Sequence, residues 1–153
     1  MSAKATVRMP WEGKEVRTLA GKPMRFLLTG QETTHASMFD CTLPPRSSTG
    51  LHVHRVIEET FYVLEGECVW QVGNELVRAK PGTFVHIPPG VPHSIANTSD
   101  KPARVLQTIS PSGHEQFFEE LEKLVARGNP DPDAVAELRN RYDTEQLSAP
   151  KAG

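Results

Sequence analysis

The segment GLHVHRVIEE, residues 50–59, carries the most concentrated chemical information in this sequence. Side chains two residues apart in a β-strand point to the same face, so His52 and His54 direct two imidazoles into one space. Imidazole nitrogen is the commonest protein ligand for several transition metals. The segment therefore predicts one half of a metal-binding site.

A carboxylate in the same segment can join the two imidazoles. Glu59 follows His54 at an odd spacing, so an unbroken strand would place it on the opposite face. A turn or bulge within residues 55–57 has to bring Glu59 back to the side of the histidines. Strand parity alone leaves Glu58 open as the alternative, because one residue more or less in that turn exchanges the two glutamates.

The second informative segment is PGTFVHIPPGVPH, residues 81–93. Its last residue, His93, follows a loop rich in proline and glycine. Prolines already restrict the backbone, so such a loop loses little conformational entropy when it becomes ordered. We expect this loop to present a third imidazole. His35, His86 and His114 lack comparable context and are interpreted as ordinary polar side chains.

Outward from these segments, the chain alternates short apolar runs with turns. Gly73-Asn74, for example, is a two-residue hairpin signal. Strands at this spacing, with no helix between them, are typical of an antiparallel sandwich or barrel. The predicted strands are Val16–Ala20, Met24–Leu28, Ser37–Leu43, Thr60–Leu64, Cys68–Val72, Glu75–Ala79, Thr83–Ile87, Ser94–Asn97 and Arg104–Ile109.

The last third of the chain has a helical pattern. Phe117, Phe118, Leu121, Leu124 and Val125 follow the spacing of one stripe on an amphipathic helix. A second helix is predicted from Asp131-Pro132, an N-cap followed by proline, to about Tyr142. We expect both helices to cover the outside of the β-structure rather than to take part in chemistry, and residues 146–153 to be a frayed tail.

Composition limits the classes of protein that this chain can belong to. It has 153 residues, which is the length of one domain, and a formal net charge of -2, which argues against nucleic acid or anionic membrane as a partner. No stretch approaches the roughly 20 apolar residues that span a bilayer. The N-terminus has no apolar run like that of a signal peptide, so we expect a cytoplasmic protein. Cys41 and Cys68 are too few for a disulfide framework.

Two spaced motifs resemble those of the cupin superfamily. The first is His52-x-His54, four residues, Glu59, six residues and Gly66. The second is Gly82, five residues, Pro88-x-Gly90, two residues, His93, three residues and Asn97. The one departure is the glycine that the family usually carries ahead of the histidines, where this chain has Pro44-Pro45 and then Gly50. That departure concerns a loop and not a ligand.

The resemblance implies an all-β fold, a cupin jelly-roll β-barrel with the C-terminal α-helices packed outside. It implies metal ligands at His52, His54, Glu59 and His93, which selects Glu59 over Glu58. One divalent transition metal ion per chain is expected, and the donor set suits Fe, Mn, Ni, Co, Cu or Zn. A homodimer is also implied. The expected division is an N-terminal arm (1–15), the barrel (16–112), the helices (113–143) and a tail (144–153).

The resemblance extends to quercetin 2,3-dioxygenase-like proteins, which implies a dioxygenase-type oxidoreductase acting on a small, flat, hydroxylated or aromatic substrate. Glu59 would act as the catalytic base. Strand parity places four further side chains in the substrate pocket: Phe61, Val63, Ile95 and Asn97. Two alternatives remain open at this point. One is a metal-cupin isomerase, decarboxylase or lyase acting on a small oxo-acid, which an inward Arg or Lys would favour. The other is a non-catalytic small-molecule-binding cupin.

Overall fold

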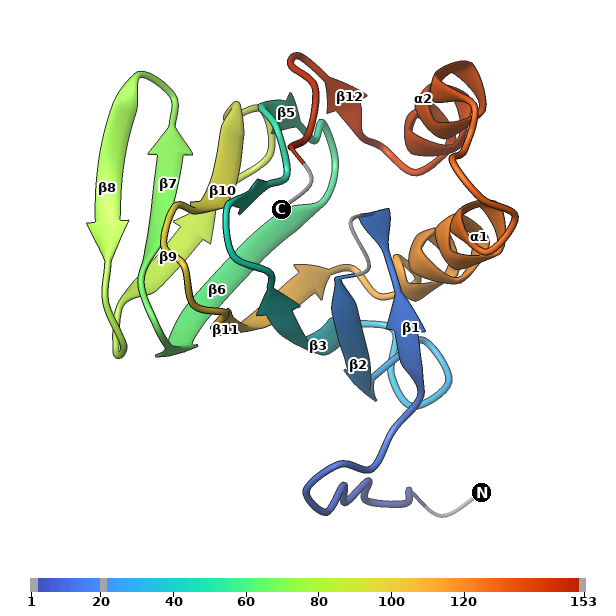
Figure 1. Ribbon diagram of the computed structural model, residues 1–153. Coiled ribbons are helices and arrows are strands. Elements are labelled where there is room, and N and C mark those ends of the chain that lie inside the picture. The colour runs from blue at the N-terminus through green and yellow to red at the C-terminus, as the bar shows by residue number, and fades with distance from the viewer. Residues whose placement is uncertain (1–2, 20–21, 152–153) are drawn as a thin grey trace.

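The computed structural model describes residues 3–19 and 22–151, which form two antiparallel β-sheets with two helices at one end (Figure 1). The first sheet has the order β1 (Glu15–Arg17), β2 (Pro23–Leu28), β3 (Ser37–Leu43), β11 (Ala103–Ser110), β6 (Glu58–Glu65) and β9 (Phe84–Ile87). The second has the order β12 (Glu145–Gln146), β5 (His52–Val53), β10 (His93–Asn97), β7 (Cys68–Val72) and β8 (Glu75–Ala79), and β4 (Ser47–Ser48) pairs with β10.

The strands alternate between buried and exposed side chains, so that the two sheets share one core. In β6, Glu59, Phe61 and Val63 are buried, whereas Glu58 and Tyr62 are exposed. Phe61 packs against the fully buried Trp70 of β7, with 5.6 Å between ring centroids. The predicted all-β jelly-roll fold is confirmed. One detail differs: the described strands stay in two hydrogen-bonded sheets, which are not closed into a barrel.

The strands that have four or more residues in the structure match the predicted strands to within two residues at each end. The first strand is shorter than expected, because β1 ends at Arg17, and Ala20 lies outside the described residues. The expectation of a frayed tail is wrong for residues 146–151. Gln146 pairs with His52, its Nε2 donates to the carbonyl of Leu51 at 3.1 Å, and Lys151 bridges to β4. Two-residue strands have no detectable periodicity, so the pattern missed them.

Helix α1 (Glu115–Val125) and helix α2 (Pro132–Arg141) follow the predicted signals. Asp131 caps α2 through a 3.0 Å bond from the backbone N–H of Asp133, and Phe117, Phe118 and Leu121 form the buried side of α1. Both helices lie at the end of the sandwich that holds β1 and β12, away from β7 and β8 (Figure 1). In the described part of the chain, no helix has the length and apolar character to cross a membrane.

Candidate metal centre

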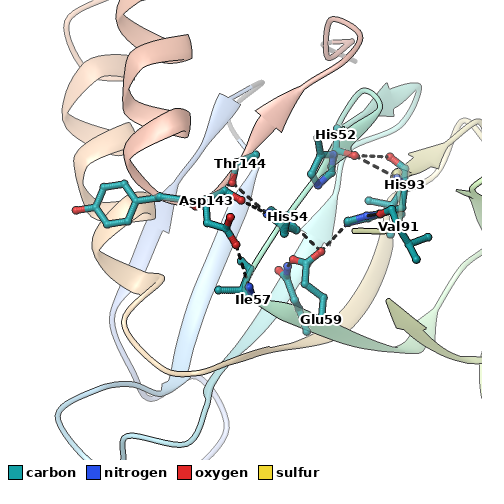
Figure 2. A network of polar contacts seen from close by, with 12 residues as sticks. His52, His54, Ile57, Glu59, Val91, His93, Asp143 and Thr144 are labelled. Carbon is teal, nitrogen blue, oxygen red and sulfur yellow. Dashed lines mark hydrogen bonds and ion pairs between the residues drawn. The ribbon is translucent and has the colours of Figure 1, made fainter. Parts of the chain in front are cut away.

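Four side chains from two separate segments, residues 52–59 and His93, converge on one point between the sheets (Figure 2). One potential ligand atom from each of His52, His54, Glu59 and His93 lies within 4.8 Å of all the others. The histidine ring centroids are 4.4 to 5.4 Å apart. All four side chains are buried or half-buried. The structure therefore brings together the complete ligand set that the resemblance implies.

The three histidine rings share one hydrogen-bonding arrangement. Each Nδ1 lies within hydrogen-bonding distance of a main-chain carbonyl: His52 with Gly50 at 2.9 Å, His54 with Asp143 at 2.8 Å, and His93 with Val91 at 2.9 Å. A carbonyl can only accept, so each Nδ1 carries a proton. In a neutral ring this leaves the lone pair on Nε2, on the side of the cluster, as in metal-binding histidines.

Glu59 completes the cluster and is held from two sides. Its Oε1 accepts a 2.8 Å hydrogen bond from Gln107 Nε2, and its Oε2 lies 2.7 Å from His93 Nε2. The Nε2 of His54 is 3.4 Å from the same Oε2 and makes no hydrogen bond, although the atom is fully buried. A buried polar atom without a partner is costly. A cation among these atoms would satisfy it, so the residues present fit a metal ion.

The electrostatics of the cluster favour the metal-binding forms of Glu59 and His52, but not that of His54. Burial opposes the charge of Glu59, but the contacts from His54 and His93 outweigh it and hold the pKa of the carboxyl well below its usual value. Burial lowers the pKa of His52 to about 4, so this ring is neutral at physiological pH. Burial also opposes a proton on His54, yet the Glu59 carboxylate attracts one and raises the pKa. A bound cation would displace that proton.

The turn that strand parity requires lies between His54 and Glu59. The carboxylate of Asp143 holds it. Oδ1 accepts from the N–H of Arg55 at 2.9 Å, and Oδ2 accepts from the N–H of Val56 at 2.8 Å. Oδ2 also accepts from the N–H of Ile57 at 2.9 Å, a contact that Figure 2 shows. The alternative ligand, Glu58, points outward and contacts the exposed His86 at 3.2 Å. The turn thus directs one glutamate inward and its neighbour to solvent.

A cavity of about 820 Å³ adjoins the cluster. His52, His54 and Glu59 form part of its lining, and the rest comes largely from the two ends of the chain. The apolar part of the wall consists mainly of Met24, Leu43, Phe117, Phe118, Leu121, Val125 and Val135. The helices therefore do more than cover the outside of the sheets, because α1 and α2 form one wall of the space that opens onto the cluster.

The four predicted pocket residues point inward but do not line this cavity. Phe61, Val63 and Ile95 are core side chains at the part of the sandwich that Trp70 fills. Asn97 braces a loop, because its Nδ2 donates to the main-chain carbonyls of Leu43 and Lys101 at 3.1 and 2.7 Å. Parity identifies which side chains face inward, and it does not reveal where the interior is left open.

The sequence interpretation missed two polar residues beside the cluster. Gln107 lines the cavity and bonds to Glu59. His114, taken as an ordinary histidine, is buried, lines the cavity and lies 6.1 Å from His54 between ring centroids. Burial lowers the pKa of His114 to about 4, so the ring is neutral. Its position one residue before the amphipathic helix is the only signal that the sequence offered.

Comparison with known proteins places this geometry in a family. Residues 39–109 match the family model described as a cupin domain. Quercetin 2,3-dioxygenase from Bacillus subtilis is 29% identical over 112 residues, which cover 71% of this chain and 33% of that protein. The tetracenomycin polyketide synthase protein TcmJ from Streptomyces glaucescens is 33% identical over 93 residues, covering 60% of this chain and 62% of that protein.

A solved structure gives the same result. That of a predicted oxalate decarboxylase from Thermotoga maritima is 28% identical, covers 70% of this chain and 99% of that one, and superposes with a TM-score of 0.59. The chain spans between about a third and two thirds of the length of the curated relatives it matches. The two spaced motifs, the jelly-roll fold and the family match agree, and residues 39–109 of this chain form a cupin domain.

Proposed function

We propose that this protein is a metal-dependent enzyme of the dioxygenase type, acting on a small, flat, hydroxylated aromatic substrate. His52, His54, Glu59 and His93 would hold one divalent transition metal ion. One observation carries the proposal: three imidazole nitrogens and a carboxylate converge beside a cavity of about 820 Å³ whose wall is largely apolar and aromatic. Such a cavity has room for an organic molecule of several rings.

The metal ion, when bound, supplies a Lewis acid that stabilises negative charge on a substrate oxygen. The residues of the chain accept the proton, position the base and exclude water. Glu59 is ionised and is the only carboxylate among the described residues that line the cavity, so it can accept the proton of a substrate hydroxyl. Gln107 holds Glu59 through Oε1. Phe117 and Phe118 bury a flat ring and exclude water from it.

The names of two relatives support an aromatic substrate. One is a quercetin 2,3-dioxygenase and the other belongs to tetracenomycin polyketide synthesis. Both relatives are longer than the segment that they share with this chain. The activity of this chain therefore has to be measured directly.

Oxygen uptake tests the proposal. The purified protein is loaded separately with Fe, Mn, Ni, Co, Cu and Zn, and oxygen consumption is followed with quercetin. We expect uptake with at least one of these metals. Glu59→Gln is expected to lower turnover by roughly 100-fold or more, the scale of a lost general base. Glu58→Gln removes an exposed carboxylate one residue away and is the matched control, with unchanged turnover expected.

Two outcomes would contradict this reaction. Absence of oxygen uptake with every metal, for quercetin and for simpler catechols, removes the dioxygenase proposal. Equal turnover in Glu59→Gln and the wild type assigns Glu59 to packing or to metal binding alone. Metal content is measured in each variant, so that loss of the metal is not mistaken for loss of the base.

A second function is favoured by a different observation. Lys22 and Arg139 line the cavity, and inward cations are the feature that favours an isomerase, decarboxylase or lyase acting on an oxo-acid. Release of carbon dioxide from oxaloacetate by the metal-loaded protein, without oxygen uptake, would support it. If neither reaction occurs and an aromatic ligand still binds, the protein is a non-catalytic binding cupin.

A further inference from the structure

We infer that the cavity binds an organic acid with an apolar ring body, and that Arg139 of α2 holds its carboxylate. The inference rests on the proposed substrate site and narrows its substrate class. It starts from a cation that faces the cavity without a counter-charge.

Arg139 belongs to the face of α2 that lines the cavity. Pro132, Val135, Ala136 and Arg139 follow the spacing of one helix face, and all four line the cavity. Arg139 is half-buried, and burial alone lowers the pKa of its guanidinium. Within residues 3–19 and 22–151, its side chain makes no hydrogen bond, ion pair or aromatic contact. Its five N–H donors are therefore free for a ligand.

Other partly buried arginines in this protein have carboxylate partners. Arg104 bonds to Asp40 at 2.7 and 2.8 Å, and Arg25 bonds to Glu15 at 2.6 Å. Removing a guanidinium from water without a partner is unfavourable, so arginines away from solvent are normally paired. The unpaired guanidinium at the cavity wall therefore indicates an anion that arrives with the ligand.

The charge of the cavity agrees with an anionic ligand. Among the described residues that line it, three side chains are cationic, Lys22, Arg139 and Lys151, and one is a carboxylate, Glu59. The whole chain has the opposite balance, with a formal net charge of -2. A divalent ion held by the histidines and Glu59 would make the cavity still more positive. A concave site of one sign attracts ligands of the other.

The shape of the site selects the kind of anion. A guanidinium donates two parallel N–H bonds to the two oxygens of a single carboxylate. The rest of the helical wall is apolar, with Phe117, Phe118, Leu121 and Val135, and buries a hydrocarbon ring more favourably than a second charged group. The occupant is therefore an aromatic or alicyclic monocarboxylate rather than a small diacid or a phosphate ester.

Equilibrium binding of matched probes tests this inference. Binding of 2-naphthoate and of its neutral isostere 2-naphthamide to the full chain is measured calorimetrically, both after removal of metal with a chelator and after loading with Zn²⁺. In both forms we expect 2-naphthoate to bind about tenfold tighter or more, the effect of one charge-assisted pair. Arg139→Gln should abolish this preference without changing the affinity for 2-naphthamide, and Arg139→Lys should retain part of it.

Arg127→Gln is the matched control, because Arg127 is exposed, lies close to α2 along the chain and does not line the cavity. The inference is overturned if Arg139→Gln keeps the preference, if Lys22→Gln abolishes it instead, or if 2-naphthyl phosphate binds more tightly than 2-naphthoate. It is also overturned if the protein prefers 2-naphthoate to 2-naphthamide only when Zn²⁺ is bound, because the carboxylate of 2-naphthoate then binds the metal ion instead of Arg139. Failure of the proposed metal chemistry can be distinguished from failure of this inference. If only the metal chemistry is wrong, the metal-free protein still prefers 2-naphthoate to 2-naphthamide.

Discussion

His93 occupies the most enclosed position in the cluster, with 2% of its surface exposed, and its ring is fixed between the Val91 carbonyl and Glu59. We predict that His93→Ala lowers the metal content from one ion per chain to near zero, because a three-donor site binds a divalent ion much more weakly. Elemental analysis after dialysis measures this. His86→Ala removes an exposed histidine that contacts Glu58 and should keep its metal.

His52→Ala provides the second test of the ligand set, because His52 comes from β5, the strand that pairs with β10, and is less buried than His93. It should also lose metal. If both variants keep one ion per chain, the proposed ligand set is wrong. If both variants lose the metal ion and their circular dichroism spectra are unchanged, the loss is due to the missing ligand and not to unfolding.

At the scale of single residues, the sequence predicts those side chains that belong to a spaced motif. His52, His54 and Glu59 lie within eight consecutive residues, so their spacing alone carries information. Gln107 and Arg139 were not predictable, because each is an isolated polar residue. The role of Gln107 depends on Glu59, 48 residues away in the sequence. The role of Arg139 depends on the cavity that it lines. No local pattern distinguishes such a residue from one exposed to solvent.

Between helix α2 and strand β12, one connecting residue controls the turn that precedes Glu59. Asp143 accepts three main-chain N–H bonds from residues 55–57, and its own carbonyl bonds to His54. It has a φ of 53°, a conformation that asparagine tolerates. We predict that Asp143→Asn, which replaces one accepting oxygen with a donor, weakens metal affinity about tenfold or more, as other losses of outer-shell support do.

Competition with a chelator measures that affinity. The matched control is Glu145→Gln in β12, which removes an exposed carboxylate paired with Arg55 and should leave the metal affinity unchanged. Wild-type affinity in Asp143→Asn would show that the sheets alone fix the ligand geometry.

The first turn of helix α1 is anchored by a second carboxylate. Glu115 accepts from the backbone N–H of Gly30 at 2.8 Å, the hydroxyl of Ser37 at 2.5 Å and the N–H of Gly113 at 3.0 Å. Burial raises the pKa of Glu115, but these bonds outweigh it and lower the pKa overall. We predict that Glu115→Gln lowers the free energy of unfolding at neutral pH by about 1.5–3 kcal/mol, the scale of hydrogen bonds to a charged group.

The pH dependence of this loss has a defined sign. Because the pKa of Glu115 is lower in the folded state, its stabilisation is complete above the usual value of 4.5 and is lost as the pH falls through the lower folded value. The difference between the wild type and Glu115→Gln should therefore shrink below about pH 4.5. Urea unfolding across this pH range measures it, with Glu119→Gln on the same helix as the control. If the difference in the free energy of unfolding between the wild type and Glu115→Gln does not depend on pH, the stabilisation by Glu115 comes from packing and not from its ionised carboxylate.

Elements of four or more residues were predictable because their periodicity extends over several side chains. The strands from β6 to β11 and both helices have such patterns, and the predicted turn within residues 55–57 was found because the parity of Glu59 demanded it. β4, β5 and β12 contain two residues each and have no period. The cavity was not predictable either, since it depends on how far α1 and α2 stand from the sheets.

At the scale of the whole molecule, the ligands and the cavity wall come from different parts of the chain. The matched cupin domain ends at residue 109, and all four proposed ligands lie within it. The helical wall with Phe117, Phe118 and Arg139 lies beyond it. We therefore expect metal binding to be the property that this chain shares most directly with its relatives. The proposed substrate preference would depend on a region that the family model does not include.

The outer surface of the first sheet offers a place for a second copy of the chain. β9 is the end strand of that sheet, and Phe84 lies opposite Tyr62 of β6 with 62% and 45% of their surfaces exposed. An edge strand beside exposed aromatic side chains favours association. We predict a homodimer in analytical ultracentrifugation that Phe84→Glu converts to a monomer. Leu76→Glu places the same charge at an exposed position of β8, in the other sheet, and should leave the dimer intact. A monomeric wild type, or a dimer that only Leu76→Glu disrupts, would contradict this interface.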